Sequence, residues 1–124
     1  MRKSLAAATI AILLSSPAVT AEYPARAITF IVPFAAGGPT DTVARTVAAS
    51  MSKSVGQPII IENVAGAGGS VGVGRAVHAL PDGYTVSVGN WSTHVINGAM
   101  YALPYDLVSD FEPIARLPDR KSVV

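Results

Sequence analysis

Short apolar runs alternate with segments of helical periodicity along this chain. The run AITFIV at residues 27–32 is rich in β-branched residues and leads into a Gly-Gly-Pro turn. Beyond the turn, apolar residues recur at helical spacing until the stop signals Gly56 and Pro58, namely Val43, Ala44, Val47, Ala48, Met51 and Val55. This order predicts a strand buried on both faces followed by an amphipathic helix, which together make a βα unit.

The same order of signals occurs twice more. PIIIEN at residues 58–63 predicts a second strand, which breaks into VAGAGGSVGVGR before a short helix that closes at PDG, and Ser70 is expected to cap that helix. YTVSVG at residues 84–89 predicts a third strand, and Met100, Tyr101 and Leu103 fit a further short helix. Strands that alternate with helices through short glycine-rich links predict an α/β fold, a parallel sheet of right-handed βαβ units.

Three polar segments follow the predicted strand ends. They span residues 34–41, 64–70 and 90–94, and all are rich in Gly, Ser, Thr or Asn. Because ligands of open parallel sheets bind beyond the carboxyl ends of the strands, the sequence predicts a ligand site formed by these three segments.

The glycine-rich segment fits no nucleotide-binding motif. Counted from Gly66, a Walker motif needs glycine at position 71 and lysine at position 72, where Val71 and Gly72 stand, and no G-x-G-x-x-G spacing occurs. Two interpretations stay open. The glycines allow the backbone to approach a small anion at a helix N-terminus, or they form a structural turn.

Thr40 and Asp41 begin the first predicted helix. Their simplest interpretation is as helix caps. A carboxylate at this position also offsets the positive end of the helix, so Asp41 is alternatively expected to hold an amino group, a water or a hydroxyl of a ligand.

The sequence contains no complete catalytic motif. Ser92 lies near His94, but no G-x-S-x-G elbow surrounds the serine and no acid is placed to orient the histidine. His78 is expected within a helix, and two histidines without H-E-x-x-H spacing predict no metal site. We therefore expect no enzyme activity and no cofactor, with an exported α/β hydrolase that uses Ser92 and His94 as the alternative.

Composition narrows the class of protein. Half of the 124 residues are apolar and the net charge is +1, which favours a folded domain over a disordered one. Nine basic residues against eight acidic ones form no basic stripe, so no nucleic-acid partner is expected. The absence of cysteine removes disulfides, thiol nucleophiles and the commonest structural zinc sites.

The first 21 residues have the pattern of a signal peptide. Arg2 and Lys3 supply a basic start, residues 5–14 an apolar core too short to span a bilayer, and Val19-Thr20-Ala21 a small-residue cleavage site. We expect cleavage after Ala21 and export to a periplasm, with a membrane anchor or a buried helix as the alternative.

Several ordered motifs resemble one known family. They are YPARAITFIVPFAAGGPTDTVAR, VGQPIIIENVAGAGGSVGVGRAV, PDGYTVSVGN, STHVINGAMY and LPYDLVSDFEPIARL. In this order, from about Tyr23 to Leu117, they are similar to the solute receptors of tripartite tricarboxylate transporters, also called the Bug family. The resemblance implies lobe 1 of a type II periplasmic binding protein, whose two α/β lobes close on a small solute and pass it to membrane permease subunits.

The resemblance also implies which residues line the ligand cleft. The solute is expected to be a small organic anion such as a carboxylate, an amino acid or an aromatic acid. The implied ligand-binding residues are Phe34, Ala35, Gly37, Gly38, Thr40 and Asp41 in the first loop, Ala67, Gly68, Gly69 and Ser70 in the second, and Ser92, Thr93 and His94 in the third.

Two features depart from the family pattern. Members commonly carry Arg or Lys where this chain has Val64, which weakens the inference of a substrate. The chain also stops at Val124, about where a second lobe should begin, so residues 22–118 are expected to form a partial N-terminal lobe that is marginally stable alone because its sheet edges are unpaired.

Residues 119–124, DRKSVV, do not resemble the family. This hexapeptide is also the translation of a widely used sequencing adapter, so we expect a non-native tail.

Two further alternatives to a transporter receptor stay open. One is a receptor that reports its ligand to a periplasmic sensor kinase. The other is a small structural or interaction domain that is complete at 124 residues.

Overall fold

The described part of the chain, residues 22–117 of a computed structural model, is built on a three-stranded parallel sheet. The strands are β1 (Ile28–Val32), β2 (Ile59–Asn63) and β3 (Thr85–Ser87), in the order β2-β1-β3. β1 pairs with β2 from Ile28↔Ile59 to Val32↔Asn63, and with β3 from Thr29↔Thr85 to Ile31↔Ser87. The α/β fold class expected from the sequence is therefore confirmed.

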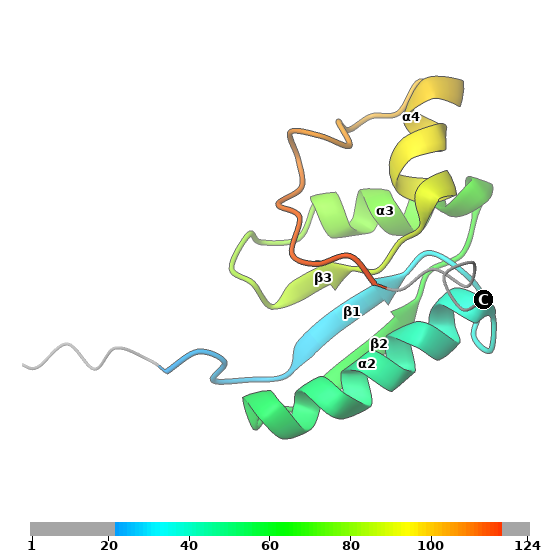
Figure 1. Cartoon of the computed structure of the whole chain (residues 1–124). Coiled ribbons are helices and arrows are strands. Elements are labelled where there is room, and N and C mark those ends of the chain that lie inside the picture. Colours follow the sequence, from blue (N-terminus) through cyan, green and yellow to red (C-terminus); the bar gives the residue numbers. More distant parts are fainter. Residues whose placement is uncertain (1–21, 118–124) are drawn as a thin grey trace, which may run out of the picture.

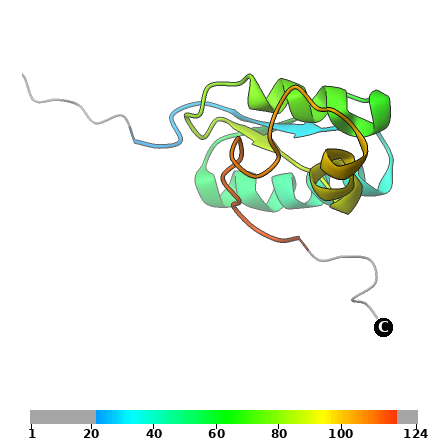
Figure 2. The same ribbon diagram turned by 90° about the horizontal axis from the view of Figure 1, so that it is seen from above.

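Two helices cover opposite faces of the sheet. The helix α2 (Pro39–Val55) lies on one face and α3 (Ser70–Val77) on the other, so the molecule has three layers (Figure 1 and Figure 2). Beyond β3 the chain forms a π-helical turn, η3 (Ser92–Ile96), which continues into α4 (Asn97–Met100). No helix in residues 22–117 combines the length and the apolar character that a membrane span requires.

The core lies mainly between the sheet and α2. Its buried side chains are Ile28, Phe30, Val32, Ala44, Ala48 and Val88. The central strand β1 supplies half of them, at alternate positions that share the face toward α2. Its Ile31 is buried on the opposite face, as the continuous apolar run predicts. On the other face, Val73 of α3 is fully buried.

Both predicted helix caps are wrong. Gly38 is the N-cap of α2 and Pro39 its first helical residue, so Thr40 and Asp41 lie inside the first turn. Gly69 is the N-cap of α3, and Ser70 is helical, with its hydroxyl donating to the carbonyl of Ala67. Both helices therefore begin after a glycine, which is extended at Gly38 and left-handed at Gly69. Neither N-terminus has a side-chain cap.

Other boundaries differ by a few residues. The third strand is shorter than the apolar run that predicted it, and Tyr101 and Leu103 lie outside α4. The third ligand segment was expected to be a loop, but it is helical from Ser92 onward. The expected signal peptide at 1–21 and the expected tail at 119–124 lie outside the described residues.

The segment η3–α4 has an inverted distribution of polarity. It buries the polar side chains of Thr93 and Asn97 and exposes the apolar side chains of Val95 and Met100, and Trp91 directly before it is exposed as well. The buried polar side chains face the glycine-rich turn η2 (Ala67–Gly69), and this contact joins the second and third ligand segments.

Candidate functional site

The three predicted ligand segments meet at one edge of the sheet. The first joins β1 to α2, the second joins β2 to α3 through η2, and the third joins β3 to η3. Because all three strands run in the same direction, these connections emerge together at the carboxyl edge (Figure 1). The N-terminal ends of α2 and α3 lie at this edge, and the N–H groups of a first helical turn have no intrahelical acceptor.

The first segment is held by a buried carboxylate. Asp41 is 2% exposed, and its Oδ2 accepts from the N–H of Gly37 and from Nε of Arg45, both at 2.8 Å. Its Oδ1 accepts from Nδ2 of Asn63 at 2.9 Å, and the same nitrogen donates to the carbonyl of Phe34 at 3.0 Å. This network connects the first loop, α2 and the last residue of β2.

The donors around Asp41 keep it charged. The hydrogen bonds from Arg45, from the Gly37 N–H and from Asn63, in that order, hold the pKa of Asp41 far below its usual range, and together they outweigh the opposing effect of burial. The same interaction raises the pKa of Arg45. Asp41 therefore remains an anion whose oxygens are already occupied by protein donors.

Gly69 allows the second segment to approach the first and third. Its φ of +92° is left-handed, and a Cβ at this position would lie 2.5 Å from Cγ2 of Thr93 and 3.3 Å from the carbonyl oxygen of Pro33. No larger residue fits here without displacing backbone. Nearby, Nδ2 of Asn97 donates to the carbonyl of Gly68 at 3.0 Å.

The third segment is organised by Asn90. Its Oδ1 accepts from the N–H groups of Ser92 and Thr93, at 3.0 and 3.2 Å, and from the hydroxyl of Ser92 at 2.8 Å. Because this carboxamide satisfies the open N–H groups of the first helical turn, the chain turns sharply from β3 into η3.

His94 faces inward, away from Ser92. Its Nε2 is hydrogen bonded to the hydroxyl of Ser87 at 3.1 Å and its Nδ1 to that of Thr93 at 2.9 Å. The ring packs edge-on against Phe111 with centroids 5.4 Å apart, and burial lowers the pKa of His94. The nucleophile–base pair required by the hydrolase alternative is therefore not formed.

The thirteen predicted ligand residues fall into three groups by exposure. The exposed ones are Ala35, Gly37, Ala67 and Gly68. The half-buried ones are Phe34, Gly38, Thr40, Ser70, Ser92 and His94, and the buried ones are Asp41, Gly69 and Thr93. The exposed positions in the first and second segments are thus glycine and alanine rather than residues with polar side chains.

Sequence analysis missed four residues that organise this edge. Arg45, Asn63, Asn90 and Asn97 make the contacts described above. An asparagine at the end of a predicted apolar run is a visible signal at positions 63 and 90. Arg45 and Asn97 lie within helices and carry no such signal.

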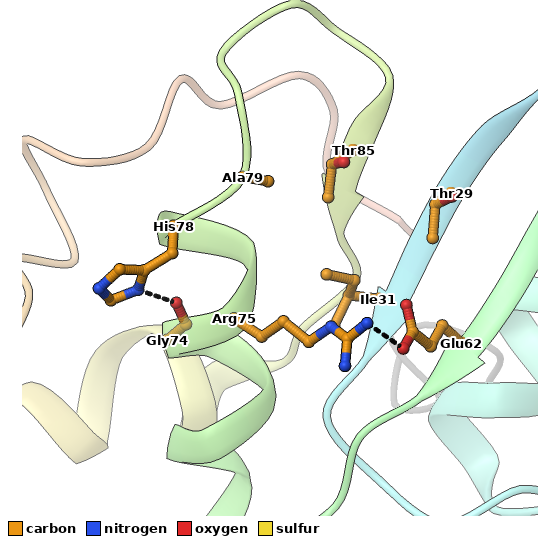
Figure 3. Close-up of a pocket in the computed structure, with 8 residues that line it drawn as sticks. All are labelled: Thr29, Ile31, Glu62, Gly74, Arg75, His78, Ala79 and Thr85. Carbon is orange, nitrogen blue, oxygen red and sulfur yellow. Dashed lines mark hydrogen bonds and ion pairs between the residues drawn. The ribbon is translucent and has the colours of Figure 1, made fainter. Parts of the chain in front are cut away.

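A separate hollow of about 470 Å³ lies between α3 and the sheet. It is lined by Thr29, Ile31, Glu62, Gly74, Arg75, His78, Ala79 and Thr85, none of which is a predicted ligand residue. Figure 3 shows Arg75 reaching from α3 to Glu62 on β2, where the two side chains form a 2.7 Å ion pair. His78 ends α3, with Nδ1 hydrogen bonded to the carbonyl of Gly74.

No cluster of three or more potential metal-ligating side chains occurs in residues 22–117. The chemistry available at the carboxyl edge is that of backbone N–H donors and hydroxyls, which suits reversible binding of a small anion.

A family model and several curated proteins match this chain. The model described as tripartite tricarboxylate transporter family receptor matches residues 43–124. Protein BugT of Bordetella pertussis is 37% identical over 108 residues, which cover 86% of this chain and 33% of BugT. A UPF0065 protein of Agrobacterium vitis is 41% identical over 97 residues, covering 78% of this chain and 28% of that protein. The chain thus spans about a third of the length of the curated relatives it matches.

Solved structures match the fold as well. MatC from Rhodopseudomonas palustris with bound malate is 51% identical, with a TM-score of 0.71 over 73% of this chain and 31% of MatC. A second protein of that organism, solved with adipate, is 37% identical, with a TM-score of 0.57 over 59% of this chain and 24% of its own.

Proposed function

Because the chain belongs to the tripartite tricarboxylate transporter receptor family, we propose that it is part of a periplasmic receptor that captures a small carboxylate for a membrane permease. The observation that carries the proposal is the meeting of three strand-end segments at one edge, with exposed backbone at Gly37 and Gly68. The malate and adipate bound by two structural neighbours support a carboxylate as the solute.

In this proposal the thirteen residues divide between contact and support. Of the exposed and half-buried positions in the first and second segments, Thr40 and Gly68 are proposed to donate backbone N–H groups to a ligand carboxylate, because the N–H of Gly37 is held by Asp41. Ser92 adds a hydroxyl from the third segment. Asp41, Thr93 and His94 support the segments through side chains that face protein partners, and Gly69 supports them by leaving room for the side chain of Thr93.

The remaining expectations are part of the same proposal. A signal peptide at residues 1–21 directs the receptor to the periplasm, and the permease subunits of the transporter are its partners. Residues 119–124 are proposed to be non-native. The family match nevertheless runs through residue 124. Sequencing the genomic gene beyond the codon for Pro118 tests this proposal. It shows whether the reading frame continues into a longer protein or encodes residues 119–124 and then stops.

Calorimetric titration tests the function. The receptor encoded at the native locus is titrated with malate and with adipate, and with an uncharged sugar as the control. We expect saturable binding of at least one dicarboxylate and none of the sugar. Binding of the sugar alone, or of none of the three, contradicts a carboxylate receptor.

A further inference from the structure

We propose that Asp41 is a positioning residue: its carboxylate fixes the shape of the first ligand segment and ties that segment to the end of β2. The inference rests on the proposed function, because it assigns a role to a residue of the same edge. It differs from a direct ligand contact, since the Asp41 side chain is only 3% exposed.

The Gly37 turn has little packing to hold it. Gly37 is exposed, has a left-handed φ of +82°, and a Cβ at this position would meet no atom within 4 Å. The only other turn hydrogen bond in this loop, from the Gly38 N–H to the carbonyl of Ala35, is long at 3.4 Å. The 2.8 Å bond from the Gly37 N–H to Asp41 is therefore the main restraint on the Gly37 turn, while Asn63 holds the start of the loop through the carbonyl of Phe34.

Asn63 transmits this restraint to the second segment. Its Nδ2 donates both to Asp41 and to the carbonyl of Phe34, while its Oδ1 accepts from Arg45 at 3.1 Å. The three side chains thus form a closed ring in which each orients the next. Since Asn63 is the last residue of β2, the second ligand segment begins where the first is anchored.

Backbone donors serve as an anion site only when their directions are fixed before binding. A loop that must be ordered by its ligand loses part of the binding free energy to that ordering. Asp41 removes this cost by holding the segment in one shape while its own charge is satisfied by protein donors.

The test compares Asp41→Asn with Ala48→Gly in the receptor encoded at the native locus. Asparagine keeps the size of the side chain but turns one acceptor into a donor that faces existing donors. Ala48 lies on the same helix about two turns away, packs in the core and belongs to none of the three ligand segments. The control therefore loses stability without touching the ring.

Two quantities are measured well below the melting temperature of each variant, namely hydrogen exchange at the Gly37 amide and affinity for malate and adipate. In Asp41→Asn we expect exchange to rise and affinity to fall by roughly tenfold or more, because one charge-assisted hydrogen bond is lost. Ala48→Gly is expected to change neither. If Asp41→Asn does not fold, Asn63→Ala breaks the same hydrogen-bonded ring at its β2 member. This variant is also expected to raise the exchange rate of the Gly37 amide.

Unchanged Gly37 exchange in a folded Asp41→Asn variant overturns the proposal. An affinity loss in Ala48→Gly as large as that in Asp41→Asn also overturns it, because the effect is then one of stability alone. Faster Gly37 exchange in Asp41→Asn, with no anion bound by the unmodified receptor, supports the restraint on the loop and contradicts the proposed function instead.

Discussion

At the carboxyl edge of the sheet Arg45 donates to Asp41 over 2.8 Å, and at the amino edge Arg26 donates to Asp82 over 2.9 Å. The two distances are nearly equal, but the surroundings differ. Side-chain exposure is 3% for Asp41 and 37% for Asp82. Asp41 also accepts from the N–H of Gly37 in its own segment and from Nδ2 of Asn63 on β2, whereas the second contact of Asp82 is the N–H of Tyr84, two residues away.

The difference shows that the length of an ion pair does not reveal what the pair does. A buried carboxylate that satisfies donors from the first loop, α2 and β2 is costly to remove, because those donors then lose their acceptor. An exposed pair contributes little, because water replaces either partner. Arg26 also lies over the ring of Tyr84, 3.8 Å from its centroid, so the guanidinium keeps a contact even without Asp82.

Replacing each aspartate by alanine gives the largest expected difference between the two edges. Asp41→Ala is expected to lower the melting temperature by roughly 10 °C or more, since it leaves buried donors unsatisfied. Asp82→Ala is expected to lower it by no more than about 4 °C, as for other exposed pairs. Thermal unfolding followed by circular dichroism makes the comparison, and equal losses would contradict the distinction drawn between the pairs.

Two glycines with similar backbone geometry extend the comparison. Gly69 and Gly83 have φ values of +92° and +81°. Gly69→Ala is expected to destabilise the fold by about 2–4 kcal/mol, because the new methyl group meets Thr93 and the backbone of Pro33. Gly83→Ala is expected to cost about 1 kcal/mol, since its nearest neighbour is the hydroxyl at the far end of the exposed Tyr23 side chain, which yields more easily than buried backbone. Denaturant unfolding measures both.

The smallest expected effect is a pH dependence of folding stability near pH 6, to which His94 contributes and Asp41 does not. Burial lowers the pKa of His94, so the unfolded chain binds more protons than the folded one just below pH 6.5. Stability from neutral His94 is thus full above that pH and falls as the pH drops toward the folded pKa. Asp41 does not contribute in this window, because the pKa of an aspartate is about 3.8 in the unfolded chain and that of Asp41 is lower still in the folded one.

Melting temperatures at pH 7.5 and pH 5.5 test this dependence. We expect a loss on acidification that His94→Gln reduces and Asp82→Asn leaves unchanged. A loss of the same size in His94→Gln would assign it to other groups.

The sheet and the meeting of the three segments were predictable because both depend on local sequence. Apolar runs at residues 27–32 and 58–63 identify strands, and the direction of parallel strands then places their following loops at one edge. The family was identifiable from the same ordered motifs, and the family model confirms it.

The interior of the site was not predictable because its contacts are distant in sequence. Asn63 reaches the carbonyl of Phe34 across 29 positions, and Asn97 reaches Gly68 across the same separation. The helix caps were wrong for a local reason, since backbone at Gly38 and Gly69 already forms the entries that Asp41 and Ser70 were expected to make. The ligand contacts themselves remain predictions.

The inverted polarity of η3–α4 gives the chain an optical reporter. Trp91 is the one tryptophan in the sequence, it is 69% exposed, and it directly follows Asn90 at the carboxyl edge. The indole fluorescence of this chain therefore originates from a single known position beside the third segment. A change that removes water from this indole or alters its surroundings will shift its emission. Folding and the proposed ligand binding can therefore be followed without attaching a dye.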